Sequence, residues 1–310
     1  MQTASTRCST MHGRLSPRAL IGLLSLLVAC QGDHLLLGEG ALQRDAGSDA
    51  ESDTGEPAGD YSVPAVIEAL SGSDTEDDDP SLTLDETELC FNSQRGGGED
   101  IWCATRQPGG PWSAPQPMEA LNSDDRETGI ALAPDGLTVW FSSDRANDES
   151  GLDIYRSERG DRGLDWSTPV RIAELSSEDD DLVSSVGEAE RLVFLARRAN
   201  DDDDYDVLVA ERASADALWG APRRLEELNT DDEESDGFLA GDGLRLVFTR
   251  DEDLILARRT STSGAFDPGA SIATLNSDQD DRDGWATPDL GHVVFSSDRD
   301  GSYRLYEAFR

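Results

Sequence analysis

The chain repeats one pattern five times, at intervals of about fifty residues, over nearly all of its length after residue 60. The copies align on a phenylalanine, which is Phe91, Phe141, Phe194, Phe248 or Phe295. One complete copy lies within residues 121–175 and reads LNSDDRETGIALAPDGLTVWFSSDR, then DIYRSER, then WSTPVRIAEL. A repeat of this length is typical of units that stack in a row or around an axis, because one unit cannot bury its apolar face alone.

Charged residues keep fixed positions within the copies. An arginine stands four residues after the phenylalanine in four copies, and Glu252 replaces it in the remaining one. The acids fourteen residues before the phenylalanine are Asp77, Glu127, Asp180, Glu234 and Asp281, and the arginines are Arg95, Arg145, Arg198 and Arg299. Both sets lie toward the same face of the repeat, so we expect them to form structural ion pairs within or between repeats.

The two ends of the repeated region complement each other. The last copy ends at Arg310, before the segment in which an aromatic residue precedes a leucine by nine positions, as Trp112 precedes Leu121. That segment occurs instead at the start, where Tyr61 stands nine residues before Leu70. We therefore expect an N-terminal strand to complete the last repeat and close a ring without open edges. An open solenoid would show atypical capping repeats at both ends.

The sequence of the unit, with APDGLTVWFSSDR, DIYRSER and WSTP, resembles the WD40-like β-propeller repeat of the TolB type (PD40-like) over residues 61–310. The resemblance implies four antiparallel strands per blade around a central channel. This chain has five copies where TolB has six blades, and nothing in it resembles the N-terminal domain of TolB. The expected fold is all-β, a five-bladed β-propeller closed by an N-terminal strand. Because unrelated activities share this scaffold, the resemblance carries no function with it.

The first sixty residues predict export and lipid attachment. Residues 1–29 contain three arginines and no acid, followed by an apolar run of eleven residues. This run is about half of the ~20 residues that span a bilayer, so it predicts a signal peptide. The run ends in Leu-Val-Ala-Cys, which resembles the lipobox of bacterial lipoproteins and makes Cys30 the expected lipidation site. An ordinary signal peptide that happens to contain a cysteine is the alternative.

Residues 30–60 are expected to form a lipidated cysteine and a disordered acidic tether, because they contain too few large apolar residues to order themselves. Gln31 follows the cysteine, a pattern that resembles lipoproteins sent to the outer membrane. We therefore expect a cell-envelope protein on the periplasmic side or the surface of the outer membrane. The lipid would be its only contact with the membrane, since no other apolar segment is long enough to insert.

The net charge of the chain is −39, and all 26 basic residues are arginine. Nucleic acid and anionic lipid are excluded as partners by electrostatic repulsion. The absence of lysine excludes Schiff-base chemistry and phosphate binding by a Walker-type lysine. Alternation of strand direction places the acidic connections on one face of the ring. The expected partner is therefore an envelope protein or another cationic molecule that docks on this face, with the chain itself a monomer.

Few residues could support nucleophilic or metal catalysis. His292 is the one histidine of the repeated region and is expected on the surface of a strand. A Ser/His/Asp site, a Cys/His site and a zinc site are therefore not expected. The acidic loops offer the oxygen ligands that calcium prefers, but they lack EF-hand spacing. We expect these loops to be solvated. We expect no metal, no cofactor and a non-enzymatic binding or scaffolding function.

One arrangement supports an enzymatic alternative. The position twelve residues before the phenylalanine is Asp79, Gly129, Leu182, Asp236 or Asp283 in successive copies. In a five-bladed ring this position would bring three carboxylates from adjacent blades to the mouth of the channel. Glycosidases cleave their substrates with paired carboxylates, so a glycoside-active propeller is the alternative hypothesis.

The cysteines also suggest a pairing. The first cysteine leaves with the signal peptide and Cys30 carries lipid, so Cys90 and Cys103 remain as a pair in an oxidising compartment. If Ser93 faces Asp100 across the hairpin, then Cys90 lies opposite Cys103. Directly opposed residues are close enough for a disulfide with modest adjustment. Two reduced and buried cysteines are the alternative.

Overall fold

The computed structural model describes residues 60–72, 75–146, 151–187, 190–198 and 204–310. The chain divides into two units, residues 1–54 and residues 55–310, and all of the described residues belong to the second. The expected signal peptide 1–29, the lipidation site Cys30 and nearly all of the expected tether 30–60 lie outside the described residues. The repeated region 61–310 is the part of the chain that the structure addresses.

The second unit contains five antiparallel sheets of four strands. The first sheet is β2 (Asp77–Leu82), β3 (Glu88–Ser93), β4 (Asp100–Thr105) and β5 (Gln116–Pro117). The second is β6 (Glu127–Leu132), β7 (Thr138–Ser143), β8 (Asp153–Glu158) and β9 (Val170–Arg171). The third is β10 (Asp180–Gly187), β11 (Leu192–Arg198), β12 (Tyr205–Glu211) and β13 (Arg223–Arg224). The fourth is β14 (Glu234–Leu239), β15 (Arg245–Arg250), β16 (Asp253–Arg258) and β17 (Ala270–Ser271). The fifth is β18 (Asp281–Ala286), β19 (His292–Ser297), β20 (Arg304–Phe309) and β1 (Ala65–Val66).

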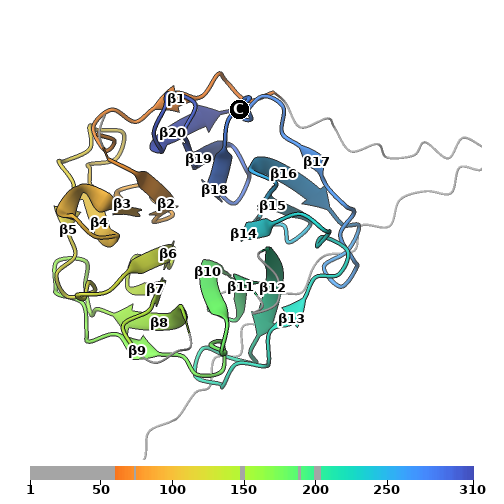
Figure 1. The fold of residues 1–310 in the computed structure, drawn as a ribbon, viewed down its shortest axis with the longest axis horizontal. Helices are drawn as coiled ribbons and strands as arrows, with labels where there is room; N and C mark the ends of the chain where they lie inside the picture. The colour runs from red at the N-terminus through yellow and green to blue at the C-terminus, as the bar shows by residue number, and fades with distance from the viewer. Residues whose placement is uncertain (1–59, 73–74, 147–150, 188–189, 199–203) are drawn as a thin grey trace, which may run out of the picture. The chain divides into compact units, whose positions relative to one another are not determined.

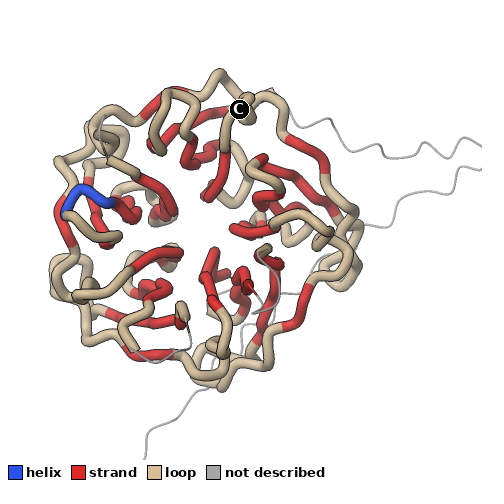
Figure 2. Tube along the Cα trace, in the orientation of Figure 1, coloured by secondary structure: helices blue, strands red, loops and turns tan. Residues whose placement is uncertain are grey.

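The five sheets lie around a common axis, and the first strand of each repeat (β2, β6, β10, β14 and β18) is nearest to that axis (Figure 1). Figure 2 shows that strands and their connections make up nearly all of this unit, with one short 3₁₀ turn at Gln94–Gly96. The domain is a five-bladed β-propeller. The fold expected from the repeat is therefore confirmed, and we call the sheets blades 1 to 5 in the order given above.

Strand β1 closes the ring as the repeat predicted. It pairs with β20 through Ala65 and Glu307 and through Val66 and Tyr306. The strand itself has two residues, but single hydrogen bonds extend the contact on both sides, including one of 2.7 Å from the Ser62 amide to the Phe309 carbonyl. The N-terminal segment thus supplies the outer strand of blade 5 and pairs the edge of β20.

The core consists of apolar layers between neighbouring blades. The middle strands are buried on both faces, as in β3, where every residue is buried. One cluster joins Cys90 and Ile101 of blade 1 to Val139 and Phe141 of blade 2, and similar clusters join the other blades. The five phenylalanines that align the repeats are all buried, with at most 4% of their surface exposed. Each blade therefore buries its apolar faces against two neighbours, which explains why a single repeat would not fold alone.

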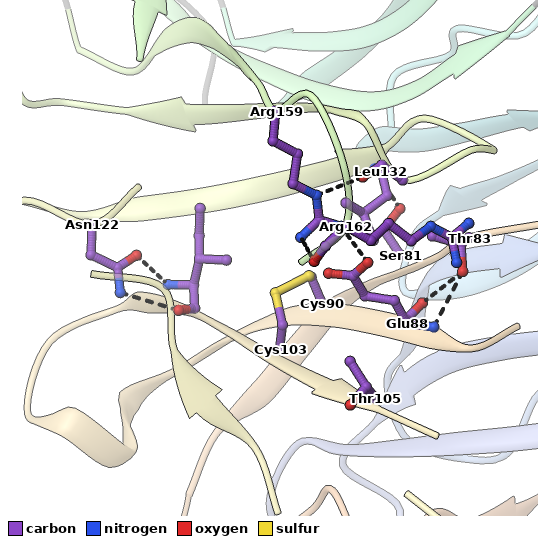
Figure 3. The surroundings of a disulfide bond; sticks show 12 residues. Ser81, Thr83, Glu88, Cys90, Cys103, Thr105, Asn122, Leu132, Arg159 and Arg162 are labelled. Carbon is purple, nitrogen blue, oxygen red and sulfur yellow. Dashed lines mark hydrogen bonds and ion pairs between the residues drawn. A yellow bond between two sulfur atoms is a disulfide. The ribbon is translucent and has the colours of Figure 1, made fainter. Parts of the chain in front are cut away.

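A disulfide joins Cys90 and Cys103 across β3 and β4 of blade 1 (Figure 3). The two residues are register partners, as are Ser93 and Asp100 three positions away on each strand. The Cα atoms are 4.1 Å apart. The bond lies in the apolar layer between blades 1 and 2 rather than near the axis.

We expect removal of residues 61–70 to destabilise the propeller strongly, because it would unpair β20 and expose a whole blade edge. It would also remove the buried side chains of Tyr61, Ile67 and Leu70, each of which contributes roughly 1.5–3 kcal/mol of apolar burial. Thermal unfolding of the chain from residue 31 is the measurement. Removal of residues 31–58 is the control and should leave the melting temperature unchanged. Equal melting temperatures for both truncations would contradict the closure.

We expect the Cys90→Ala/Cys103→Ala variant to be less stable by about 3 kcal/mol, because the disulfide closes a short loop in the unfolded chain. Chemical denaturation of the two proteins, both secreted through an oxidising compartment, measures the difference. Alkylation of the parent protein without reduction, followed by mass spectrometry, checks the bond directly. Recovery of two alkylated cysteines would show that the pair is reduced in the mature protein.

Candidate functional site

The innermost strands of four blades contain a β-bulge that turns one residue toward the axis. In each, the register of pairing shifts by the same amount, for example between Asp78 and Ser81 of β2. The first bulged residue has a positive φ angle: 50° at Asp79, 59° at Gly129, 56° at Asp236 and 57° at Asp283. Aspartate is one of the few side chains that tolerate this region, and bulges commonly re-aim a side chain. The bulge is therefore the local feature that positions these residues.

The structure brings together the three carboxylates that the sequence placed at the channel mouth. Asp79, Asp236 and Asp283 each offer an oxygen atom that lies within 4.8 Å of the other two. They come from blades 1, 4 and 5, which are consecutive around the ring because blade 5 meets blade 1 at the seam. We call these three residues the channel aspartates.

Blades 2 and 3 contribute no carboxylate to this cluster. Gly129 of blade 2 donates its amide to Asp79 Oδ2 at 2.8 Å, and the Thr128 hydroxyl donates to the same oxygen at 2.7 Å. A Cβ at Gly129 would lie 3.0 Å from the Val183 carbonyl oxygen, so both space and φ favour glycine. Blade 2 therefore holds a channel aspartate in place instead of adding a fourth one.

Blade 3 departs from the alignment because the connection between its first two strands is two residues shorter. Four residues separate Gly187 from its partner Leu192, whereas six separate Leu132 from Val139 in blade 2. The register of β10 shifts between Val183 and Ser185, which leaves Ser184 as the bulged residue. Leu182, the residue twelve positions before the phenylalanine, pairs regularly with Ala196. The expected equivalence of Leu182 with the channel aspartates is therefore wrong, since the shorter connection changes the register of β10 against β11.

A single arginine accompanies the channel aspartates. Arg282 Nη2 lies 3.1 Å from Asp78 Oδ2, and its Nε lies 3.4 Å from Asp283 Oδ2. Its guanidinium group stacks over the ring of Tyr303 at 4.0 Å from the centroid. The charges of Asp283 and Asp78 outweigh the effect of burial and raise the pKa of Arg282 above its usual value. Arg282 is thus a fixed cation that is shared among several acids.

Burial and mutual repulsion make these carboxylates unusually basic. Burial, followed by the charge of Asp283, raises the pKa of Asp79 to about 6, against the opposing hydrogen bond from Gly129. Burial and the charges of Asp283 and Asp79 also raise the pKa of Asp236 well above its usual range. For Asp78 the causes are burial and the charge of Asp79. Such shifts mark groups that are held close together in a poorly solvated place.

Two cavities meet at the channel aspartates, and all three residues line both of them. One has a volume of about 440 Å³ and a strongly acidic wall, which includes Asp78, Glu99, Asp231, Asp232, Glu233 and Glu252. The other has a volume of about 80 Å³, and its wall is mainly apolar, including Leu82, Ile130, Leu132, Val183, Phe238 and Trp285. The channel aspartates therefore separate an acidic half of the channel from an apolar half.

The repeated acid and arginine pairs line neither of the two cavities, and their charges are compensated. In blade 2, Arg145 Nη2 donates to Glu127 Oε1 at 2.8 Å and to the Leu121 carbonyl at 2.5 Å. The Ser123 and Ser143 hydroxyls donate to the same carboxylate oxygen at 2.6 and 2.9 Å. Glu127 is completely buried, and its charge is matched by one arginine and several donors. Such a network anchors the start of β6 and leaves no site for a ligand.

The other blades repeat this network with two changes. The structure pairs Arg95 with Asp77 at 2.5 Å, and it also pairs Arg299 with Asp281. In blade 4 the pairing arginine is Arg250, whose Nε lies 2.8 Å from Glu234 Oε1. Arg250 stands two residues after its phenylalanine, a position that is serine or alanine in the other blades. The sequence does not predict this pair from the fourth position after the phenylalanine, because that position is Glu252 in blade 4.

In blade 3, Asp180 and Arg198 form an ion pair, but a neighbouring pair occupies the buried position. Arg197 Nε donates to Asp181 Oδ1 at 2.6 Å, and the Ser177 amide and hydroxyl donate to Asp181 Oδ2 at 2.6 and 2.8 Å. Asp181 has no exposed surface. The buried acid of blade 3 therefore stands thirteen residues before the phenylalanine and not fourteen.

His292 lies at the seam between blades 5 and 1 and lines neither of the two channel cavities. Its Nδ1 is 3.1 Å from Glu86 Oε2 and its Nε2 is 3.2 Å from Glu307 Oε2. The ring stacks on Phe309 with centroids 4.2 Å apart. The expectation of a strand-surface histidine is wrong, because the residue is buried between two blades with 5% of its surface exposed.

No protein-family model matches the sequence, and no curated protein matches it. Several solved structures are similar to the structure of this chain. A putative TolB from Agrobacterium tumefaciens is 15% identical over 71% of this chain and 69% of that chain, with a TM-score of 0.47. A thermostable family-43 glycoside hydrolase is 12% identical over 77% of this chain and 89% of that chain, with a TM-score of 0.52. An α-L-arabinofuranosidase from Lactobacillus brevis is 14% identical over 79% and 92%, with a TM-score of 0.52. At such identities the similarity concerns the fold alone.

Among the residues that the structure describes, no helix has the length and apolar character needed to cross a bilayer.

We expect the Asp236→Asn variant to be more stable than the parent protein at pH 7.5 in the presence of a chelator. A carboxylate with a raised folded-state pKa binds its proton more tightly in the folded protein, so its contribution to stability is lost as the pH rises through that pKa. Asparagine tolerates positive φ and accepts the same Ser235 hydrogen bond, so the variant removes only the charge. The gain should be on the order of 1 kcal/mol or more at pH 7.5 and should vanish near pH 4.

Thermal unfolding between pH 4 and 8 measures this difference. Asp124→Asn is the matched control, because Asp124 is an exposed acid that does not line the channel cavities. An Asp236→Asn variant that is less stable than the parent protein at pH 7.5 would show that the ionised carboxylate is already compensated.

Proposed function

We propose that the propeller is a non-enzymatic binding module of the cell envelope, anchored by lipid on Cys30, that recruits a cationic protein partner through the acidic half of its channel. The observation that supports this most directly is the cavity of about 440 Å³ at the axis. In its wall, the acids greatly outnumber two arginines, Arg126 and Arg282. A concave surface of one charge concentrates the field and attracts a partner of the opposite charge.

The chemistry of this surface indicates the kind of partner. A basic segment of a protein can place arginine or lysine side chains among the carboxylates of the rim, for example Asp231 and Asp232. These rim acids are exposed, so their attraction acts mainly on the rate of association and is screened by salt. Nucleic acid and anionic membranes are disfavoured by the same charge.

A glycoside-active propeller is the second candidate function, and the channel aspartates are the observation that favours it. They are carboxylates with raised pKa values in a cavity, which is a common arrangement for a general acid. Their spacing weighs against it. A retaining glycosidase needs carboxyl groups about 5–5.5 Å apart, and an inverting enzyme needs about 6.5–9.5 Å. The oxygens of the channel aspartates lie within 4.8 Å of one another, which leaves little room for a sugar between them.

The scaffold proposal predicts that a partner captured from envelope extract binds the chain from residue 31 at a rate that falls as salt rises from 0.05 to 0.5 M. The Debye length shrinks over this range from roughly 14 to 4 Å, so an association steered by the acidic cavity must slow down. Asp231→Asn/Asp232→Asn/Glu233→Gln should reduce the association rate at low salt by about tenfold. Surface plasmon resonance with the purified partner measures both effects.

Asp124→Asn/Asp165→Asn/Asp216→Asn is the matched control, because it removes the same charge from exposed acids outside the cavity. An association rate that is insensitive to salt, or equal losses in both variants, would contradict docking on the acidic cavity. A panel of aryl glycosides tests the second candidate. Turnover by the parent protein that Asp236→Asn abolishes would favour the enzyme over the scaffold.

A further inference from the structure

We propose that the channel aspartates, Asp79, Asp236 and Asp283, bind one divalent cation of the size of Ca²⁺ on the propeller axis, with the hydroxyl of Thr249 as a further oxygen donor. The proposal does not depend on the scaffold function, because a bound ion would be compatible with either candidate. It rests on the geometry of the carboxylates, on their incomplete neutralisation, and on a buried hydroxyl that has no partner.

The spacing of the carboxylates fits one ion. Calcium binds oxygen at about 2.3–2.6 Å, so two oxygens on opposite sides of the ion are at most about 4.6–5.2 Å apart. The three oxygens of the channel aspartates lie within 4.8 Å of one another, so one calcium ion can contact all of them. The donor set is all oxygen, which suits calcium and magnesium and does not suit zinc or copper.

The charges around the cluster leave it strongly negative. Arg282 is the nearest cation, but it is shared with Asp78 as well as Asp283. Asp79 receives hydrogen bonds from Thr128 and Gly129, which are neutral donors. Asp236 receives one neutral donor, the hydroxyl of its neighbour, at 2.5 Å. Carboxylates so close together need either protons or a cation between them.

Thr249 is an independent indication of a ligand. It lines the acidic cavity together with the channel aspartates and is buried, with 5% of its surface exposed. In the described parts of the chain its Oγ1 has no hydrogen-bond partner. Buried hydroxyls nearly always have a hydrogen-bond partner, and the protein itself supplies none for this atom.

The repeat shows which way the Thr249 side chain points. Thr249 follows the phenylalanine of blade 4 directly, and Ser296 holds the same position in blade 5. The Ser296 hydroxyl donates to Asp283 Oδ2 at 2.5 Å, so this position faces the channel aspartates. In blade 4 the Thr249 hydroxyl makes no hydrogen bond to Asp236, which accepts one from the Ser235 hydroxyl instead. Thr249 is therefore placed to bind an ion, or a water molecule on an ion, beside Asp236.

The surroundings favour calcium over magnesium. Calcium accepts six to eight oxygens in irregular geometry, and water from the acidic cavity can fill the positions that protein atoms leave open. Magnesium needs a nearly ideal octahedron at about 2.0–2.1 Å and loses its water reluctantly. On the opposite side the wall is apolar, with Val183, Phe238 and Trp285, so little water reaches the cluster from there.

The experiment is a titration of the chain from residue 31, freed of metal by a chelator, with CaCl₂ at pH 7.5 and 0.15 M NaCl. We expect one saturable calcium site with a dissociation constant of about 10⁻⁴–10⁻³ M, the range of extracellular modules. The affinity should rise between pH 5 and 7.5, because the ion displaces protons from the carboxylates. Calcium should also raise the melting temperature. Absence of a saturable site, or tighter binding of MgCl₂ than of CaCl₂, would overturn the proposal.

Variants locate the ion. Asp236→Asn should weaken calcium binding at least about tenfold by removing one charged ligand, and Thr249→Val should weaken it several-fold without changing charge. Asp124→Asn/Asp278→Asn is the matched control, since both residues are exposed and lie outside the channel cavities. If the control weakens binding as much as Asp236→Asn does, the calcium is held by the loops and the proposal fails.

A second readout covers the case in which Asp236→Asn folds poorly. Terbium occupies calcium sites and emits light when a nearby aromatic side chain absorbs, and Tyr205 lines the same cavity as the channel aspartates. We expect sensitised terbium emission that CaCl₂ displaces and that Thr249→Val weakens. Emission that calcium does not displace, or that Thr249→Val leaves unchanged, would place the ion elsewhere and overturn the proposal.

Discussion

The pairing of β1 with β20 is the interaction on which the rest of the propeller depends. Five blades make a ring only if blade 5 meets blade 1, and β1 secures that meeting because the first strand of the propeller belongs to the last blade. Other contacts reinforce the seam, among them the Asp77 amide to the Tyr303 carbonyl at 3.0 Å and Arg282 to Asp78 at 3.1 Å. The candidate site depends on the same closure, because Asp79 lies on one side of the seam and Asp283 on the other. Without the ring, the channel aspartates would not converge.

The sequence predicts the number of blades, the closing strand and the three channel aspartates, because each follows from a fixed offset within a repeat. It fails where a blade departs from that offset. The connection between β10 and β11 is shorter than in the other blades, and in blade 3 the buried acid is Asp181 rather than Asp180, and Leu182 is no counterpart of the channel aspartates. In blade 4 the arginine moves to Arg250. The positive φ angles could not be predicted either, because a bulge arises from the pairing of two strands and is not encoded by one residue.

The acids of this protein fall into two classes with opposite electrostatics. Glu127 and its counterparts are fully buried, yet each is matched by an arginine and by hydroxyl donors, so they hold a strand in place. The channel aspartates are poorly matched, and burial together with the charges of neighbouring aspartates raises the pKa values of Asp79 and Asp236. Uncompensated charge lowers stability, and proteins commonly retain it where it serves binding or catalysis. The contrast within one repeat therefore makes the axis the candidate functional part of the molecule.

The position of the channel aspartates also links ligand binding to the integrity of the ring. Repulsion among ionised carboxylates from blades 1, 4 and 5 opposes the approach of these blades to the axis. Blades 1 and 5 meet at the seam, where closure depends on a strand of two residues and the hydrogen bonds around it. A cation on the axis would reverse the sign of that interaction and draw the same three blades together. Any cationic group that enters the acidic cavity would act in the same direction, whether it is a metal ion or an arginine of a partner. Occupancy of the channel and stability of the closed ring are therefore thermodynamically linked, since a ligand that binds only the closed form must stabilise it.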